Sequence, residues 1–142
     1  MVSRHKSLPP VAADTSADVH RIYVAAPWVR KEEAKYVAGR LNDAGFVVTS
    51  RWIDMHGGDH DPVVLRREAQ HDWDDIRAAT VLVVLNIEKS EGKATEQGIA
   101  LERGLKIVGV GIPKNNVFHY LPQYRWVASV VELINLLNSP DF

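Results

Sequence analysis

The sequence predicts an α/β protein with a flavodoxin-like three-layer sandwich, in which helices cover both faces of a five-stranded parallel sheet in the order 2-1-3-4-5. Three observations lead to this prediction. Short apolar runs alternate with helical patterns along the chain, as in parallel sheets. The run at residues 80–85 is apolar on both faces, which is typical of a central strand covered from both sides. The runs number five, and this strand order is a common doubly wound arrangement.

The first elements are a strand, a helix and a second strand. Residues 22–26 form a β-branched and aromatic run that stops at Pro27, which predicts a buried strand. A helical stripe follows and ends near Gly45, and a second strand is expected at 46–49, with a possible extension to Trp52. The stripe has apolar side chains at helical spacing: Ala34, Val37, Ala38 and Leu41.

The middle of the chain predicts a loop and a long helical region. Residues 54–60 are polar and contain two glycines, so we expect a mobile loop over the pocket. Asp61 followed by Pro62 is typical of a helix N-cap with proline at the first helical position. The helix should run to Ala78, with a break expected at 72–74.

The second half repeats the alternation of strands and helices. After the central strand at 80–85 and a loop at 86–92, the pattern predicts a helix at 93–103 that Gly104 closes. Residues 106–110 and 125–127 are expected to be the last two strands. Ser129 and Glu132 form a capping box at the start of the final helix.

Composition excludes several classes of protein. The chain has 142 residues and suits one domain, which we place at residues 19–142 behind a flexible leader at residues 1–18. A net charge of −1 without a basic block argues against a nucleic-acid polymer as partner. The chain lacks cysteine, a membrane-length apolar run and the apolar core of a signal peptide, so we expect a cytoplasmic protein with no membrane partner.

The predicted strand order places a ligand crevice between the first and third strands. Ligands of such sheets bind beyond the carboxyl ends of the strands at the point where the order reverses. The segments expected to meet there are Ala26-Pro27-Trp28 and the loop at 86–92. The indole of Trp28 could form an apolar wall against a flat ring.

Glu96 is the candidate nucleophile of this crevice. It falls in the first turn of the helix predicted at 93–103, where the positive end of the helix favours an ionised carboxylate. The alternative is an ordinary acidic residue in a first turn, which is common for the same electrostatic reason.

Two further features support a reactive site. Tyr23 is the only polar side chain of an apolar strand, and its hydroxyl needs a partner if it is buried. Asp72, Asp74 and Asp75 are clustered, and neighbouring carboxylates raise one another's pKa, which suits a group that hands over a proton. The alternative for the cluster is an N-cap with solvated charges.

Three segments in this order resemble the nucleoside 2-deoxyribosyltransferase family. They are residues 22–28, Asp72 with Ile76 and the strand after it, and residues 92–100, which resemble the family's Gly-x-x-x-Glu-x-Gly-x-Ala segment. The resemblance covers residues 21–137. It implies the flavodoxin-like fold already expected from the pattern.

The resemblance also implies a reaction. Glu96 would attack C1′ of a 2′-deoxynucleoside, Tyr23 would orient that carboxylate, and Asp72 would contact the base and protonate it as it leaves. A covalent deoxyribosyl-Glu96 intermediate would then pass the sugar to another nucleobase or to water, as in retaining glycosidases. The implied partners are a deoxynucleoside or deoxynucleotide and a free nucleobase. No metal or organic cofactor is implied.

One branch of the family hydrolyses 2′-deoxynucleoside 5′-monophosphates, and this chain resembles it at Ser90, where a phosphate-contacting serine is expected. Gly92 would contact the same substrate. However, the turn at 26–29 lacks the branch's glycine-rich phosphate cradle, and Arg30 and Lys31 also suit a solvated helix. We therefore prefer a nucleoside substrate, with the monophosphate as the alternative.

Two other classes compete with an enzyme of this family. One is a nucleotide-binding module without turnover, which would not need Tyr23, Asp72 and Glu96 together. The other is a TIR-type domain, which the segment at 92–100 matches less well.

The family forms homodimers or higher homo-oligomers, in which Asn116 or Tyr120 of a neighbour could reach the sugar; an ordinary polar loop is the alternative. His56 and His60 are separated by two glycines and fit no common zinc spacing, so we expect no metal site there.

Overall fold

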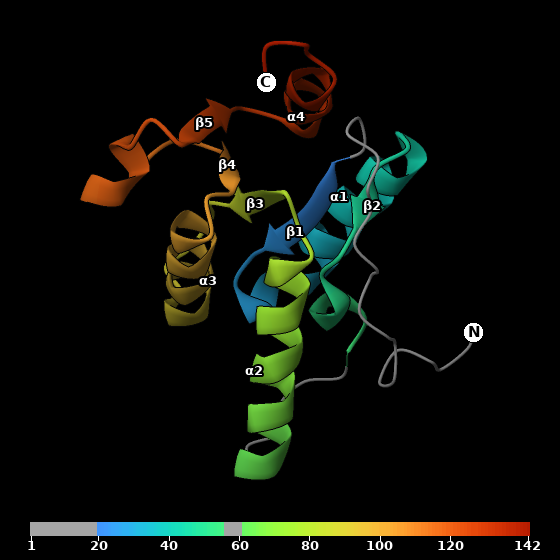
Figure 1. The fold of residues 1–142 in the computed structure, drawn as a ribbon, viewed down its shortest axis with the longest axis vertical. Coiled ribbons are helices and arrows are strands. Elements are labelled where there is room, and N and C mark those ends of the chain that lie inside the picture. Colours follow the sequence, from blue (N-terminus) through green and yellow to red (C-terminus); the bar gives the residue numbers. More distant parts are fainter. Residues whose placement is uncertain (1–19, 56–60) are drawn as a thin grey trace.

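The computed structural model describes residues 20–55 and 61–142, so the expected leader and most of the expected mobile loop lie outside the described residues. A five-stranded parallel sheet has the order β2-β1-β3-β4-β5, which confirms the predicted fold class (Figure 1). The strands are β1 (Arg21–Ala25), β2 (Val47–Val48), β3 (Val81–Leu85), β4 (Lys106–Val110) and β5 (Tyr124–Val127).

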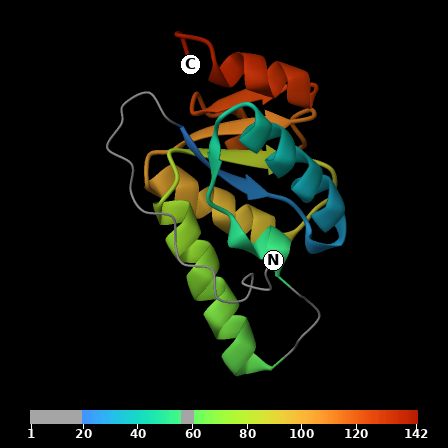
Figure 2. The ribbon, with the colours of Figure 1, turned by 90° about the vertical axis from the view of Figure 1, so that its right-hand side faces the viewer.

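Helices cover both faces of this sheet. On one face α1 (Lys31–Asp43) contacts α4 (Val130–Leu137), and on the other α2 (Pro62–Arg77) contacts α3 (Glu91–Glu102). Every residue of β3 is buried, as its two apolar faces predict. α2 extends well beyond the sheet (Figure 2). In the described part of the chain, the length and apolar character that a membrane crossing requires are found in none of the helices.

The register of β1 and β3 sets the position of the crevice. Tyr23 pairs with Leu82 and Ala25 pairs with Val84, so both strands end at the same edge of the sheet. The segments after them, which begin at Ala26 and Asn86, therefore emerge next to each other. The order predicted from the sequence thus identified the correct edge.

The second strand is shorter than predicted, since only Val47 and Val48 pair with β1. The chain then turns into a 3₁₀ helix, η3 (Arg51–Asp54), and does not extend the strand to Trp52. Asp75 stabilises this turn: its carboxylate accepts hydrogen bonds from the backbone N–H of Arg51 at 3.0 Å and from the Nε of Arg51 at 2.9 Å. This contact is long-range, so the local pattern could not show it.

The predicted break in α2 is wrong, because the helix is continuous from Pro62 to Arg77. The three aspartates do not interrupt it, since each has a different environment: Asp75 is buried against Arg51, Asp74 accepts from Gln70, and Asp72 lines a cavity. The predicted N-cap is confirmed, as the Asp61 side chain accepts a hydrogen bond from the N–H of Val63.

α3 begins at Glu91, two residues before the predicted start. Ser90 is its N-cap, and the Ser90 hydroxyl accepts a hydrogen bond from the N–H of Lys93 at 3.2 Å. Glu96 therefore lies in the second turn, and the prediction of a first-turn position was wrong. The field of the helix N-terminus is weaker there, since its effect falls off within the first turn.

Candidate active site

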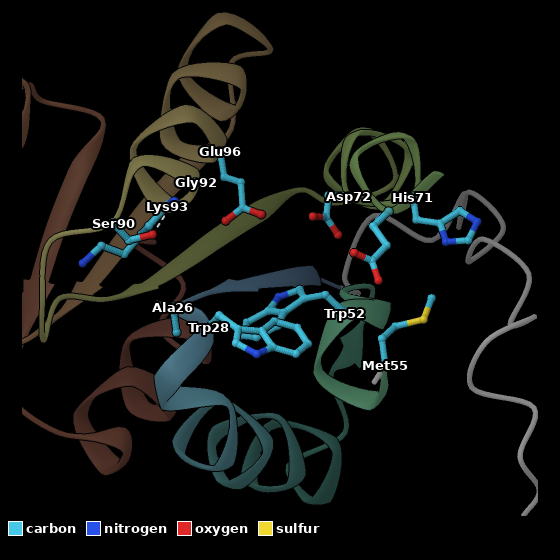
Figure 3. Close-up of a pocket in the computed structure, with 11 residues that line it drawn as sticks. Ala26, Trp28, Trp52, Met55, His71, Asp72, Ser90, Gly92, Lys93 and Glu96 are labelled. Carbon is cyan, nitrogen blue, oxygen red and sulfur yellow. Dashed lines mark hydrogen bonds between the residues drawn. The ribbon is translucent and has the colours of Figure 1, made fainter. Parts of the chain in front are cut away.

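A cavity of about 180 Å³ opens at the carboxyl ends of β1 and β3 (Figure 3). Its lining combines aromatic walls with carboxyl groups and one loop. The residues that line it are Ala26, Trp28, Trp52, Met55, Glu68, His71, Asp72, Ser90, Gly92, Lys93 and Glu96.

Tyr23 and Glu96 meet at this cavity. The Tyr23 hydroxyl donates a hydrogen bond to Oε2 of Glu96 across 2.5 Å. Tyr23 is fully buried on β1, and burial together with the charge of Glu96 raises the pKa of its hydroxyl well above the usual value. Tyr23 therefore remains a proton donor to Glu96, and the partner expected for its buried hydroxyl is the carboxylate on α3.

Burial raises the pKa of Glu96 to about 7, and the hydrogen bond from Tyr23 opposes part of this rise. The sequence predicts that the helix N-terminus favours the ionised form of Glu96, and this prediction is wrong. Desolvation in the cavity dominates, because Glu96 lies beyond the first turn. Near neutral pH both protonation states of Glu96 are therefore populated.

Asp72 faces the same cavity from α2. Burial, followed by the neighbouring charges of Glu96, Asp75 and Glu68, raises the pKa of Asp72 to about 8. The clustering of carboxyl groups does contribute, as the sequence suggested, although burial is the larger cause. Only Glu96 receives the Tyr23 hydroxyl. The hydrogen bond from Tyr23 therefore favours the negative charge on Glu96 over Asp72.

The other two aspartates of the cluster serve the fold. Asp75 is fully buried and forms an ion pair with Arg51. Asp74 accepts a hydrogen bond from Gln70 on the exposed side of α2. Of the three clustered residues, Asp72 alone lines the cavity.

Two indoles form one wall of the cavity. Trp28 and Trp52 lie with ring centroids 5.9 Å apart at 44°, and Trp28 is 44% exposed. Trp52 is fixed by a 2.8 Å hydrogen bond from its Nε1 to the carbonyl oxygen of Val24. The sequence predicts the wall at Trp28 but not the contribution of Trp52. Its position after the second strand, at the same sheet edge, was the available signal.

The end of the cavity at the loop after β3 contains Ser90 and Gly92, as predicted. Lys93 was missed: its buried ammonium donates to the carbonyl oxygens of Glu88 at 2.5 Å and Leu85 at 3.4 Å, which ties the loop to β3. Pro27 does not line the cavity. Its carbonyl accepts from the N–H of Arg30 and starts the short helix η2 (Trp28–Arg30).

The end of the cavity farthest from Ser90 is formed by α2 and η3. Met55, Glu68 and His71 line it, and none of them was predicted from the sequence as a cavity residue. Glu68 and His71 precede Asp72 by four and one positions on α2. The helical spacing from Asp72 was the available signal for Glu68.

Asn116 and Tyr120 lie away from Glu96 within this chain. Asn116 caps the 3₁₀ helix η4 (Val117–Tyr120) through a hydrogen bond from the N–H of Phe118, and Tyr120 is 70% exposed. Asn116 lines a second cavity, between α3 and η4, that does not include Glu96. Their expected contribution to a neighbouring subunit stays a prediction.

Residues 20–55 and 61–142 contain no group of three or more histidine, cysteine or acidic side chains arranged to hold a metal ion. His56 and His60 lie outside the described residues.

The comparisons with known proteins give the fold a context. No family model matches the sequence, and no curated protein does. Among solved structures, the CMP N-glycosidase BcmB of Clostridium botulinum is 20% identical with a TM-score of 0.56, over 83% of this chain and 98% of that one. The 2-deoxyribosyltransferase of Bacillus psychrosaccharolyticus is 19% identical with a TM-score of 0.59, over 81% of this chain and 90% of that one. The chain therefore has the α/β fold of these two enzymes.

Proposed function

We propose that the chain is a member of the nucleoside 2-deoxyribosyltransferase family, and that it cleaves the N-glycosidic bond of 2′-deoxynucleosides. The observation that carries this proposal is the 2.5 Å hydrogen bond from Tyr23 to Glu96 in a cavity that Asp72 also lines. The fold shared with an N-glycosidase and a deoxyribosyltransferase supports it.

In the first step the Glu96 carboxylate attacks C1′ of the sugar. A bond forms between the Glu96 oxygen and C1′ while the bond from C1′ to the base nitrogen breaks, and its electron pair leaves with the base. The protonated Asp72 carboxyl group donates its proton to the departing base. Tyr23 holds the attacking carboxylate in position throughout.

In the second step an acceptor attacks C1′ and releases Glu96. The acceptor is the ring nitrogen of another base or a water molecule, and Asp72, now a carboxylate, accepts its proton. The ester bond breaks, and the Glu96 carboxylate is restored. This sequence retains the configuration at C1′.

The cavity gives the substrate an orientation. Figure 3 shows Ser90 and Gly92 on one side of Glu96, with Asp72, His71 and Met55 on the other. With C1′ at Glu96, the sugar's 5′ end points to Ser90, and the base lies against the indoles near Asp72. Flat rings stack well on aromatic walls of this kind.

A nucleoside 5′-monophosphate is the second candidate substrate. Ser90 lines the cavity where the 5′ end would lie, and one of the two similar structures is a CMP N-glycosidase. Against a phosphate, the Lys93 ammonium is engaged by two backbone carbonyls, and Arg30 is paired with Glu88. We therefore place the nucleoside first.

The deciding experiment incubates the protein with deoxynucleosides and their 5′-monophosphates, with and without a free acceptor base, and identifies the products by chromatography. Exchange of bases indicates transfer, and release of free deoxyribose or its phosphate indicates hydrolysis. Glu96→Gln should reduce turnover by at least about a thousandfold, since it removes the nucleophile.

The matched control is Glu102→Gln, an exposed glutamate at the end of the same helix, which should keep wild-type turnover. Turnover by the Glu96 variant at the wild-type rate would exclude the covalent mechanism. Absence of cleavage of any substrate by the wild-type protein would favour a binding module or a TIR-type domain.

We also infer a homo-oligomer, because the family resemblance implies that a neighbour contributes to the site. Exposed apolar side chains on η4 support this: Val117, Phe118 and Tyr120 are all more than half exposed. Such surface is common where another subunit packs.

A further inference from the structure

Among the described residues that line the cavity, Glu68 is the one carboxyl group to which the proposed reaction assigns no role. Glu96 is hydrogen-bonded to Tyr23, and Asp72 holds the transferable proton. Glu68 is half-buried and makes no hydrogen bond or ion pair with any residue in the described part of the chain. Its carboxylate oxygens can therefore accept hydrogen bonds from a molecule bound in the cavity.

The position of Glu68 on α2 places it next to the nucleobase of the proposed substrate and away from the sugar. It lies four residues before Asp72 on α2, so the two side chains are neighbours on one face of the helix. Both line the cavity, and the charge of Glu68 contributes to the raised pKa of Asp72. The edge of a base that stacks on Trp28 and Trp52 would therefore meet Asp72 and Glu68 side by side.

The two carboxyl groups differ in hydrogen bonding. A protonated Asp72 donates, whereas the Glu68 carboxylate only accepts. A ring nitrogen that accepts, next to an exocyclic amino group that donates, complements this pair. Cytosine and adenine have that arrangement, while uracil, thymine and hypoxanthine place a carbonyl oxygen where the amino group would be. A carbonyl oxygen against a carboxylate leaves two acceptors facing each other without a proton.

We propose that Glu68 is a specificity-determining residue that selects bases with an exocyclic amino group, cytosine or adenine, over their oxo counterparts. This inference rests on the proposed function, since it assumes that the base lies between the indoles and α2. His71 does not neutralise Glu68 by a hydrogen bond, because its buried Nδ1 makes none with a described residue. Glu68 interacts electrostatically with Lys31, whose ammonium lies 4.5 Å from the centre of the Trp28 ring.

The test uses substrate pairs that differ only in this group. Deoxycytidine is compared with deoxyuridine and deoxyadenosine with deoxyinosine, each as nucleoside and as 5′-monophosphate, and kcat/KM is measured for every member. We expect at least a tenfold preference for the amino member of at least one pair, the lower end of what one well-placed polar contact gives. Glu68→Gln should reduce this ratio at least fivefold, mainly through faster cleavage of the oxo member, because an amide also donates.

The matched control is Asp74→Asn, which removes the same charge from the same helix on the side away from the cavity, where Gln70 is its partner. Its amino-to-oxo ratio should equal that of the wild type. Inhibition by free bases gives a second readout, in which cytosine or adenine should inhibit more strongly than uracil or hypoxanthine.

The outcomes separate the two proposals. Equal rates on both members of each pair, a preference for the oxo members, or an unchanged ratio in Glu68→Gln would overturn the inference and leave the proposed function intact. If the wild-type protein cleaves none of the substrates, the proposed function fails and the inference with it.

Discussion

At the scale of single residues, the hydroxyl of Tyr23 gives the carboxyl groups of Glu96 and Asp72 different roles. Glu96 and Asp72 face the same cavity, and burial raises the pKa of both, to about 7 and about 8. The Tyr23 hydroxyl donates to Glu96 alone, so the charge prefers Glu96 and the proton prefers Asp72. A nucleophile and an acid thus arise from the same chemical group.

A bell-shaped pH profile follows for kcat/KM. Below about pH 7 Glu96 is protonated and cannot attack, and above about pH 8 Asp72 has lost the proton for the leaving base. We expect a maximum between pH 7 and 8, measured with a nucleoside substrate of constant charge. Asp72→Asn should abolish the basic limb, and a flat profile from pH 5 to 9 would contradict the assignment.

Tyr23→Phe tests the orienting role. The substitution removes the hydroxyl from Glu96, which should lower kcat about tenfold to a hundredfold and move the acid limb of the profile to higher pH. Loss of a packed hydroxyl alone would not move that limb. Unchanged kcat together with an unchanged limb would exclude the role.

Glu96 should also reduce the stability of the fold above neutral pH. Its pKa is raised on folding, so the native state binds more protons than the unfolded state, and stability is lost as pH rises from about 4.5 to about 7. Glu96→Gln should therefore raise the free energy of unfolding by on the order of 1 kcal/mol at pH 8, with no such gain at pH 4. Thermal unfolding at the two pH values measures the difference.

At the scale of elements, the turn of η3 fixes the aromatic wall. Asp75 on α2 binds both the backbone and the side chain of Arg51, and the next residue, Trp52, lines the cavity. The ion pair joins two elements that are 24 residues apart in sequence. Both partners are buried, since Asp75 is fully buried and Arg51 is 6% exposed. Through the backbone of Arg51, the ion pair therefore positions Trp52, which forms part of the cavity wall.

Asp75→Ala should lower the free energy of unfolding by about 3 kcal/mol, because it leaves a buried guanidinium without its carboxylate. It should also raise KM more than it lowers kcat, since Trp52 shifts while Glu96 and Tyr23 keep their contact. Denaturant unfolding and steady-state kinetics check the two effects. Asp74→Asn is the control, and equal stability of both variants would contradict the structural role.

At the scale of the whole molecule, the apolar side chains of η4 are exposed and available to a neighbouring subunit. If a neighbour's Tyr120 completes the site, the protein should sediment as a dimer or a larger assembly. Tyr120→Ala should then lower activity at least about tenfold without a comparable loss of stability, because Tyr120 is 70% exposed in the chain. A monomer in sedimentation, with full activity of the variant, would exclude a shared site.

The local pattern of the sequence determined most of the fold. The buried strands, their parallel order and the caps at Asp61 and Ser129 follow from apolar periodicity and capping chemistry, which act over a few residues. The pattern, together with the family resemblance, also predicted Tyr23, Asp72 and Glu96 as site residues. Tyr23 and Glu96 are hydrogen-bonded, and Glu96 and Asp72 both line the cavity at the crevice that the topology predicts.

Only the tertiary structure decided the rest, since burial and long-range contact are properties of the packed chain. The cap at Ser90 moved Glu96 out of the first turn, and desolvation, not the helix N-terminus, sets its pKa. The pairing of Asp75 with Arg51 stabilises η3, whose Trp52 lines the cavity. The continuity of α2 also brings Glu68 to the cavity, because an unbroken helix places Glu68 on the same face as Asp72.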